Sequence, residues 1–485
     1  MRKPRATAAA TRPTAAQARR LVDLGACIDF LDRSGQLLRV KSEVDPKFEL
    51  AGVAQRLEGG KCVLFENVRG SDVPVLTGLL WNRDIVATLF GLPTEEVPFA
   101  IARAIASWQQ GRDALPGRLR TRAPANEVIE QRVDLSRLPA PVHALKDGGR
   151  YLDSSLVMAR NPLTGATNVS IHRLMLARKD RITFLIDPGR HLGEYVAVAE
   201  QRGEKLPVTI SNGVGLAPWI VSALPRLGDG KNLVAHHLVG RGIDYVQAQQ
   251  VDVPAYADAQ FVIEAEILPG VREAEAPFGE VTGYYGERAK RWVMRVLAIT
   301  HRAQPVLHTV ISGQEVWNAV GFTAEAAIFH AVKREIPELV AVCLPHGGCG
   351  FYEAVVQVRN TRKGIGQDAI RATFRAFRPL QRVIVVDTDV DLRDAVDVDW
   401  AVTTRFDPDL DLVLLPHEDG HILNPIVTMD ADGKGGTITK LGMDALVPFG
   451  APRQRFERVK FQAVDLSKYE IVDTAQRRQR GKAGR

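Results

Sequence analysis

Apolar and turn-forming residues in the first quarter of the chain are arranged in a way that predicts a short helix and several strands. Residues 28–40 predict a helix and then a strand, joined by a polar turn. Apolar runs at residues 63–65 and 73–80 continue the pattern. We therefore expect a small N-terminal α/β domain over residues 21–125, which ends in the Pro- and Arg-rich residues 116–124.

The middle and the end of the chain show different patterns. Between residues 157 and 310 the apolar segments are short, often β-branched and interrupted by Gly or Pro, which is typical of a mostly β domain. We expect a barrel over residues 126–315. From residue 324 onward, helical stretches alternate with apolar strands, which predicts an α/β domain over residues 316–470. The expected fold class is a mixed α+β and α/β multidomain chain.

Positive charge is concentrated at the two ends of the chain. The net charge is +6, but residues 1–20 and 474–485 hold eleven Lys and Arg residues and no acidic residue, so the body between them is mildly acidic. A basic groove for nucleic acid is therefore not expected. We expect residues 1–20 to be a disordered basic tail, with organelle import as the minority interpretation, and residues 471–485 to be a second basic tail.

Apolar runs, cysteines and motifs exclude several classes of protein. The longest apolar runs are far shorter than the ~20 residues that span a bilayer, so no membrane span is expected. The four cysteines form no CxxC pair and are too sparse for a disulfide framework, which favours a reducing, cytoplasmic setting. The sequence also lacks a phosphate loop, a dinucleotide-binding GxGxxG, HExxH and GxSxG, which argues against the enzyme classes that depend on them.

An acidic stretch around a tight turn offers candidate catalytic carboxylates. Pro277 and Gly279 prevent a helix, so Glu275 and Glu280 flank the turn and can project toward one site. Two carboxylates in an apolar frame suit acid–base chemistry, because burial and like charge favour the protonated form of one of them. Taken alone, such a stretch is more often a solvated acidic loop.

A second polar stretch lies earlier in the chain. Residues 168–173 include Asn168, Ser170 and Arg173, and His191 follows. An amide oxygen suits a hard cation, hydroxyl and backbone donors suit a phosphate, and a guanidinium suits a carboxylate. Each of these residues alone is more often structural or at the surface, so it is their clustering that predicts a site.

These two stretches resemble motifs of the UbiD family of prenylated-FMN-dependent (de)carboxylases. Residues 168–173 resemble the pattern NxSIxR, and residues 275–284 resemble EGPFGExxGY, with Ala276 in place of the first Gly. The resemblance covers about residues 28–450. Further matches in the family's order and spacing occur at residues 30–40, 64–68, 385–391, 400–405 and 440–445.

The resemblance implies a fold, a cofactor and a reaction. The middle domain would be a split β-barrel that binds prenylated FMN, supplied by a partner flavin prenyltransferase. The C-terminal domain would mediate assembly into a homodimer or a homohexamer. The implied reaction is reversible, non-oxidative decarboxylation of an aromatic, heteroaromatic or α,β-unsaturated carboxylic acid through a covalent adduct with the flavin. By position, Arg173, Glu275 and Glu280 would form the catalytic set, with Glu275 as proton donor.

The resemblance also implies contacts to the cofactor and to metal ions. Family members bridge the flavin phosphate with a divalent ion, usually manganese (Mn2+), accompanied by potassium (K+), and Asn168 and His191 match two of the divalent ligands. The third ligand is usually a Glu, at the position of Arg241, and an arginine cannot ligate a metal. Either Arg241 contacts the phosphate itself, or another acid such as Asp244 is the ligand, or the local alignment is shifted by a residue. The residues that match cofactor contacts are Asn168, Ser170, Ile171, Arg173, Arg190, His191, Ser222, Ala223, Pro225 and Arg241.

Two other functions stay open at this point. A flavin-binding split barrel can also host a flavin reductase with ordinary FMN and a nicotinamide donor, although hydride transfer does not need Arg173, Glu275 and Glu280. A non-catalytic flavin-binding subunit is the second alternative, and Arg241 motivates it. Residues 346–352 resemble a subgroup of the family that acts on small aromatic acids, although such a run is also an ordinary glycine turn.

Overall fold

The computed structural model divides the chain into two compact units, Met1–Leu446 and Val447–Arg485. The C-terminal sheet, predicted to belong to a domain that runs to residue 470, ends at Ala445 within the first unit. In the described part of the second unit the only helical segments are short 3₁₀ turns, and apolar side chains such as Phe461 are exposed. The structure describes residues 13–111, 117–186, 191–224, 227, 230–430 and 435–469.

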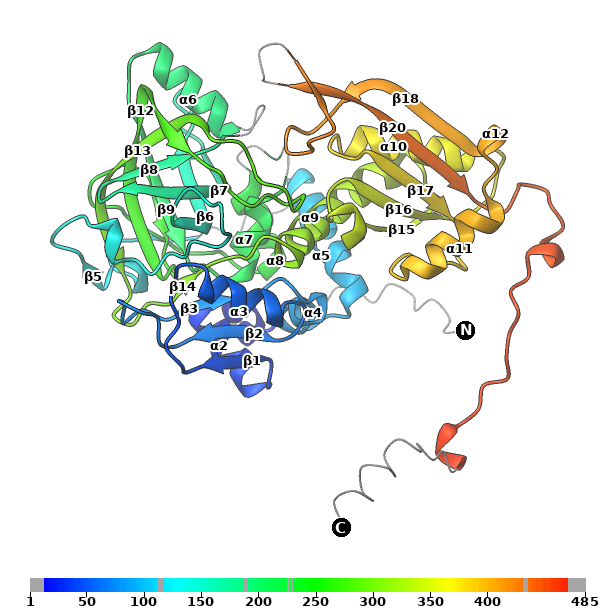
Figure 1. Ribbon diagram of the computed structural model, residues 1–485, viewed down its shortest axis with the longest axis horizontal. Helices are drawn as coiled ribbons and strands as arrows, with labels where there is room; N and C mark the ends of the chain where they lie inside the picture. The colour runs from blue at the N-terminus through cyan, green and yellow to red at the C-terminus, as the bar shows by residue number, and fades with distance from the viewer. Residues whose placement is uncertain are drawn as a thin grey trace. The chain divides into compact units, whose positions relative to one another are not determined.

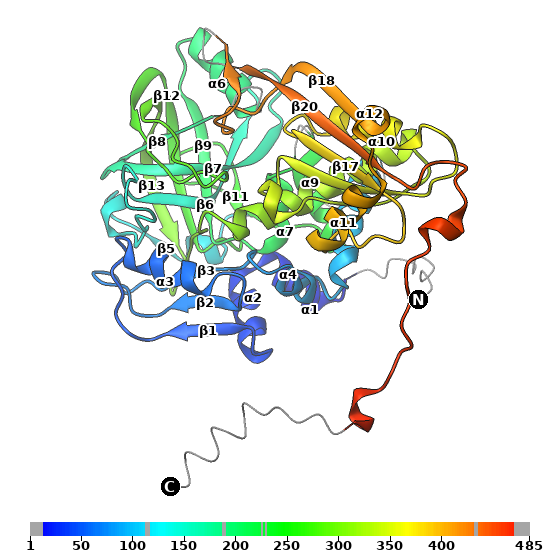
Figure 2. The same ribbon diagram turned by 45° about the vertical axis from the view of Figure 1, so that its right-hand side comes forward.

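The N-terminal domain is built on a four-stranded sheet with the order β1-β2-β3-β14. β1 runs parallel to β2, β2 antiparallel to β3, and β3 parallel to β14. In Figures 1 and 2 this sheet and its helices lie below the barrel. The elements are α1 (Ala15–Val22), α2 (Leu24–Arg33), β1 (Leu37–Val40), α3 (Glu49–Leu57), β2 (Cys62–Phe65), β3 (Val75–Thr77), α4 (Arg83–Phe90), α5 (Val97–Gln109) and β14 (Leu307–His308).

Helix α1 lies in a stretch that was predicted to be a disordered tail. The Thr14 hydroxyl accepts a hydrogen bond from the backbone N–H of Gln17, and the Gln17 side chain accepts one from the backbone N–H of Thr14. Ala18 and Leu21 are buried on one face of the helix. The prediction was therefore wrong for residues 15–20, because a capping box and an apolar face stabilise a helix there. Residues 1–12 lie outside the described residues.

The middle domain is a closed six-stranded barrel, which confirms the predicted split barrel. Its strands follow the order β12-β9-β6-β7-β8-β13, every neighbouring pair is antiparallel, and pairing of β12 with β13 closes the ring. Two-residue β5 extends the sheet beside β13. The elements are β5 (Val128–Ile129), β6 (Tyr151–Arg160), β7 (Thr167–Arg178), β8 (Arg181–Phe184), α6 (His191–Gln201), β9 (Leu206–Asn212), α7 (Leu216–Ser222), α8 (Lys231–Val239), β12 (Phe261–Glu275) and β13 (Ala289–His301).

A separate small sheet has the strand order β11-β10-β4. Along the chain, β4 precedes the barrel strands, and β10 and β11 lie between β9 and β12. β10 pairs antiparallel with β11 and parallel with β4. The three strands have two residues each: β4 (Leu119–Arg120), β10 (Tyr245–Val246) and β11 (Ala255–Tyr256).

The C-terminal domain is an α/β layer structure around the sheet β15-β16-β17-β20-β18, with β19 beside β20. Alternate residues of β16 point to opposite faces: Val356 packs in the core that includes α10, and Val355 packs in the core that includes α11. This alternation explains why helices cover both faces. The elements are α9 (Gln314–Glu335), β15 (Leu339–Cys343), β16 (Glu353–Val358), α10 (Ile365–Ala376), β17 (Arg382–Val386), α11 (Ala395–Arg405), α12 (Pro408–Asp411), β18 (Leu412–Asp419), β19 (Thr428–Met429) and β20 (Gly436–Ala445).

Across the described ranges, no single helix is long and apolar enough to cross a membrane. By length and composition alone, α4 and the segment Thr94–Gln109 pass such a test together, with a bend of 77° between them.

A buried carboxyl connects helix α9 to the N-terminal sheet. The Glu315 side chain has no exposed surface and accepts hydrogen bonds from the Thr77 hydroxyl and from the backbone N–H groups of Gly78 and Leu80, at 3.1, 3.1 and 3.2 Å. Burial raises the pKa of Glu315 from 4.5 to about 7, and the donors oppose this shift without cancelling it. The folded chain therefore holds this proton more tightly than the unfolded chain.

Replacing Glu315 should change how stability depends on pH. Because the pKa is raised on folding, the stability that Glu315 contributes is fully present below pH 4.5 and is lost as the pH rises through about 7. The stability of the wild type relative to Glu315→Gln should therefore fall between pH 5 and pH 8, by about 3 kcal/mol at most. Thermal unfolding across this pH range measures the difference, with Glu335→Gln at the exposed end of the same helix as control. A difference that stays constant or grows with pH would contradict the assignment.

Candidate active site

Arg173, on strand β7, lies at the centre of the site. Its Nε and Nη2 atoms donate to the two carboxylate oxygens of Glu275, each at 3.1 Å, and its Nη1 atom donates to Glu280. Only 11% of the Arg173 side chain is exposed. The closed barrel makes this contact possible, because β7 and β12 lie on opposite sides of the six-stranded ring. The structure thus brings together the three residues predicted to act as a set.

The two carboxylates lie on either side of the turn that the sequence predicted. Glu275 is the last residue of β12 and is fully buried, and Glu280 follows in the loop with 8% of its surface exposed. Ala276 adopts a φ of 71°, in the left-handed region that favours glycine, which explains why the family motif has Gly at this position. A Cβ atom on Gly286 would lie 2.5 Å from Glu280 Oε1, so this glycine makes room for the carboxylate.

Two aromatic residues complete the surroundings of Arg173. The Tyr151 hydroxyl, on β6, donates to Glu275 Oε1 at 3.2 Å. Burial raises the pKa of Tyr151, and the neighbouring Glu275 raises it further, so the phenol keeps its proton. The centroid of the Phe278 ring lies 5.3 Å from Cζ of Arg173 and 4.4 Å from the centroid of the Tyr151 ring. The ring face favours the cation and keeps water from it.

The sequence prediction did not include the pair that His143 and Asp153 form near Arg173. His143 Nε2 lies 2.9 Å from Asp153 Oδ2, and Asp153 also accepts hydrogen bonds from the Thr309 hydroxyl and the Val310 backbone. Burial lowers the pKa of His143, but the charge and hydrogen bond of Asp153, together with the charges of Asp147 and Glu315, outweigh burial, so the net shift is upward. These residues are far apart in the sequence and only the fold brings them together, so no local motif could have identified them.

A cavity of about 230 Å³ opens beside this network. Arg173, Glu280 and Asp153 contribute polar groups to its wall, and Glu275 lies behind Arg173 with no exposed surface. The rest of the lining is mainly apolar and includes Ile171, Leu185, Trp219, Phe278, Val316 and Phe351. A few polar groups in an apolar wall are typical of a small-molecule site.

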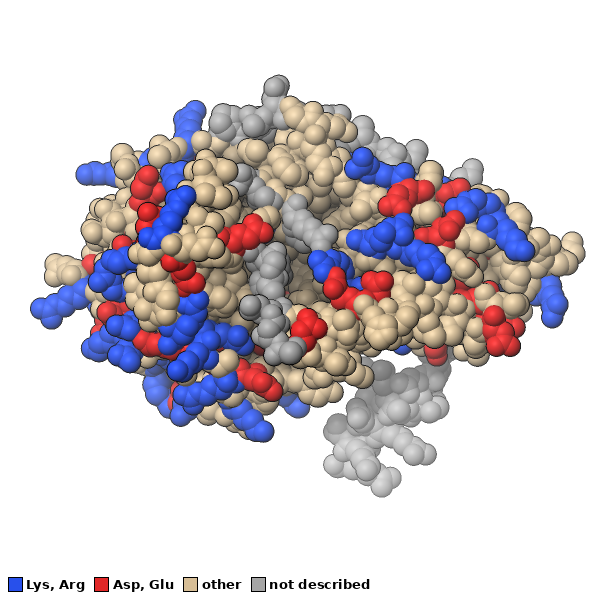
Figure 3. All heavy atoms as spheres, turned by 90° about the horizontal axis from the view of Figure 1, so that it is seen from above, with Lys and Arg blue, Asp and Glu red and all other residues tan. Residues whose placement is uncertain are grey.

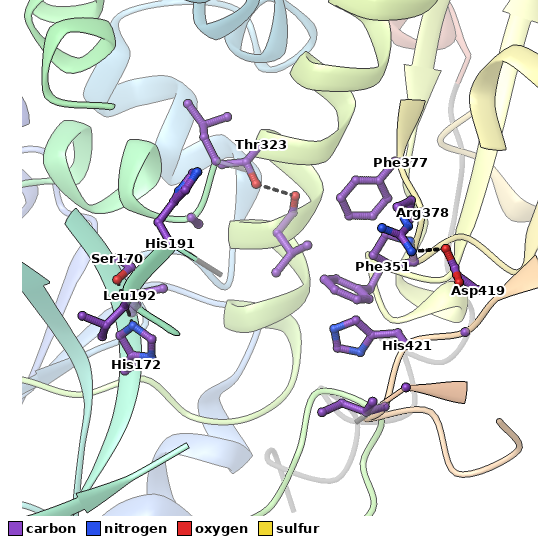
Figure 4. A pocket seen from close by; sticks show the side chains of 18 of the residues that line it. Ser170, His172, His191, Leu192, Thr323, Phe351, Phe377, Arg378, Asp419 and His421 are labelled. Atoms are coloured by element: carbon purple, nitrogen blue, oxygen red, sulfur yellow. Dashed lines mark hydrogen bonds and ion pairs between the residues drawn. The ribbon is translucent and has the colours of Figure 1, made fainter. Parts of the chain in front are cut away.

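A larger cavity of about 450 Å³ lies next to it, between the barrel and the C-terminal domain. Figure 4 shows Ser170, His172 and His191 on one side of this space and Phe351 and His421 on the other. Figure 3 shows a recess between the two parts, with basic and acidic residues intermixed on this face. The volume is within the range of about 300–1,000 Å³ that ligand pockets occupy.

Most predicted cofactor contacts meet at this larger cavity. Asn168, Ser170, Ile171, His191, Ser222 and Ala223 all line it. Arg190 and Pro225 lie outside the described residues. Arg241 is exposed and lines neither cavity, and Asp244 accepts hydrogen bonds from Arg120 at 2.8 and 2.5 Å. Arg241 follows the Gly240 turn at the surface, away from the cavity that gathers the other predicted contacts, and its contact with a phosphate stays a prediction.

Among the described residues, the barrel wall of this cavity offers the Asn168 amide, the hydroxyls of Ser170 and Ser222, imidazoles and the Lys231 ammonium. The Asn168 Oδ1 atom is buried and makes no hydrogen bond to another described residue, so it is available to a ligand in the cavity. The described ranges contain no group of three His, Cys, Asp or Glu side chains that could hold a metal ion. Near Asn168 the structure instead places Lys231, the first residue of α8, which the sequence prediction did not include.

Family models match the chain over most of its length, in the order found in the structure. The N-terminal, Rift-related and C-terminal domains of 3-octaprenyl-4-hydroxybenzoate carboxy-lyase match residues 28–105, 118–315 and 318–445. An uncharacterized protein from the cooM 5′ region of Rhodospirillum rubrum is 42% identical, over 93% of this chain and 97% of its own. Anhydromevalonate phosphate decarboxylase of Methanosarcina mazei is 34% identical, over 89% of this chain and 98% of its own.

Solved structures show the same fold. HmfF of Pelotomaculum thermopropionicum, a UbiD-class enzyme in complex with FMN, superposes with a TM-score of 0.86 at 36% identity and covers 92% of this chain and 100% of its own. An evolved dimeric form of HmfF in complex with prFMN has a TM-score of 0.82 at 34% identity, with the same coverage. Both the sequence and the fold therefore show that this chain belongs to the UbiD family of carboxy-lyases.

Proposed function

We propose that the chain catalyses reversible, non-oxidative decarboxylation of an aromatic, heteroaromatic or α,β-unsaturated carboxylic acid, with prenylated FMN as cofactor and Glu275 as proton donor. The observation that carries this proposal is the pairing of Arg173 with two buried carboxylates beside an apolar cavity. A flavin reductase has no need of such a set, because hydride transfer does not require a carboxyl proton donor held by an arginine. The set also argues against a non-catalytic subunit.

The number of charges in the set supports proton transfer. One guanidinium between two carboxylates leaves a net negative charge when both are ionised, and the set is neutral when it holds one proton. Neutrality is the less costly state where water is excluded. A proton on Glu275 is then available to the substrate carbon that loses its carboxylate. In the carboxylation direction the same carboxyl would take the proton back.

Arg173 would also bind the carboxylate of the substrate. A guanidinium has five N–H donors, and the pairs with Glu275 and Glu280 use three of them, so donors remain on the cavity side. A substrate carboxylate at Arg173 would compete with Glu275 for the cation. This competition would release the Glu275 carboxyl toward the cavity at the stage when the substrate is bound.

The flavin would occupy the larger cavity. Prenylated FMN, when bound, supplies an acceptor for the electron pair that stays on the substrate when carbon dioxide leaves. Ser170, Ile171, His191, Ser222 and Ala223 would hold it, and the unpaired amide oxygen of Asn168 would face its phosphate end. The HmfF structures with FMN and with prFMN support this assignment.

The size of the inner cavity favours a small acid. A volume of about 230 Å³ beside Arg173 suits a single ring or a short unsaturated chain, and Phe351, from the run that resembles the small-aromatic-acid subgroup, lines the cavity. As part of the same proposal, a flavin prenyltransferase supplies the cofactor, and the chain acts in the cytoplasm as a homodimer or a homohexamer. The dimeric form of HmfF supports self-association.

Replacing the proton donor tests the proposal most directly. Glu275→Gln removes the proton and keeps the shape of the side chain, so kcat should fall at least ~100-fold while the flavin stays bound. Carbon dioxide release and the flavin absorption spectrum measure the two effects. Glu273→Gln, on the same strand and paired with Arg181, is the matched control and should keep most activity. Loss of flavin from Glu275→Gln, or its full activity, would count against the role of Glu275.

Removal of the central cation should destabilise the site in a way that a second substitution repairs. Arg173→Met leaves two buried carboxylates facing each other, which should cost about 3–5 kcal/mol of stability. Adding Glu280→Gln to the same chain removes one of these charges and should recover part of the loss, because the residues are coupled. Thermal unfolding of the single and double variants measures the coupling. Strictly additive effects would show that the three residues do not act as one network.

A further inference from the structure

Lys231 is buried where the barrel meets the cofactor cavity. It is 4% exposed, and its ammonium donates to the backbone carbonyl oxygens of Val169 and Ser222, at 3.0 and 2.8 Å. Lysines are rarely buried to this degree, because removing an ammonium from water is costly unless several oxygen atoms surround it. Two backbone carbonyl oxygens therefore accept hydrogen bonds from a buried ammonium in the wall of the cavity.

The Lys231 ammonium lies beside the segment of Asn168, the residue that faces the phosphate end of the flavin in the proposed function. Val169 stands between Asn168 and Ser170, and Ser222 precedes Ala223, so both carbonyl acceptors belong to segments that line the cavity. Lys231 itself also lines the cavity. Backbone carbonyls that converge on one point are typical ligands of a hard cation such as potassium. Here the ammonium of Lys231 donates hydrogen bonds to these carbonyl oxygens.

The remaining donors near this point are weak ligands for a divalent ion. Asn168 and His191 line the same cavity and offer a neutral amide and an imidazole, while the acids in its described lining, Asp419 and Asp430, come from the C-terminal domain, and Asp419 is paired with Arg378. Asp244, the alternative ligand, is engaged by Arg120. A flavin phosphate carries close to two negative charges and needs positive charge nearby in a site of low dielectric.

We propose that Lys231 is a built-in cation that replaces the metal ions at the phosphate end of the flavin, so that this chain binds its flavin without manganese or potassium. The inference rests on the proposed function in one respect: a flavin must bind in the cavity lined by Asn168 and Lys231. An ammonium at this point would supply positive charge to the phosphate without any bound ion. Asn168 then acts as a hydrogen-bonding amide instead of a metal ligand.

Titration of the full chain with FMN tests this proposal. Fluorescence quenching gives the Kd in chelator-treated buffer with tetramethylammonium as the only cation, and again with manganese and potassium added. We expect the two values to agree within about twofold. Lys231→Met should weaken binding by at least about tenfold, and Lys231→Glu should bind FMN only when the metal ions are present. Lys205→Met, which removes an exposed lysine paired with Glu266, is the control.

The metal content of the protein gives a second measurement. Elemental analysis of the flavin-loaded wild type should find far less than one manganese per chain, and Lys231→Glu should gain it. A wild type that needs manganese or potassium for tight FMN binding, or that holds one manganese per chain, would overturn the inference and leave the proposed function intact. Absence of FMN binding under every condition would instead contradict the proposed function. The wild-type titration decides the question even if the Lys231 variants fail to fold.

Discussion

The structure of the site depends on one guanidinium that is shared by two buried carboxylates. Arg173 crosses from β7 to the end of β12, and without its charge Glu275 and Glu280 would repel each other in an enclosed space. The neighbouring side chains and the barrel strands stabilise this contact. Tyr151 donates to Glu275, Phe278 covers the guanidinium, and the barrel holds the two strands at the distance that one arginine spans.

The three predicted domains contribute different parts to this arrangement. The middle domain supplies Arg173, both carboxylates and most of the predicted cofactor contacts that line the larger cavity. Phe351 and His421 of the C-terminal domain form the opposite wall of the larger cavity, as Figure 4 shows, and both also line the smaller cavity beside Arg173. Glu315, at the start of α9, connects this helix to the N-terminal sheet by accepting hydrogen bonds from Thr77, Gly78 and Leu80. The C-terminal wall and the network of Arg173, Glu275 and Glu280 are therefore held by separate interactions.

Sequence patterns identified the parts of the site that lie in continuous motifs. The motifs around Arg173 and Glu275 were sufficient to predict the set, and the β-branched middle region was sufficient to predict the barrel. Contacts between distant segments, such as His143 with Asp153 and Lys231 with Val169, leave no local pattern. The sequence left three alternatives at Arg241, because a single substitution in a loop cannot show whether its side chain turns inward. The sequence contains the Thr14–Gln17 pair that forms the capping box. The prediction missed this helix start because it relied on the concentration of positive charge in residues 1–20.

The mass of the flavin bound to the protein tests the central claim most directly. The protein should be produced together with a flavin prenyltransferase, and the cofactor released and weighed intact. The account predicts FMN that carries one added prenyl unit, on a protein that releases carbon dioxide from a small unsaturated or aromatic acid. Unmodified FMN that a nicotinamide donor reduces rapidly would contradict the account and identify the chain as a flavin reductase.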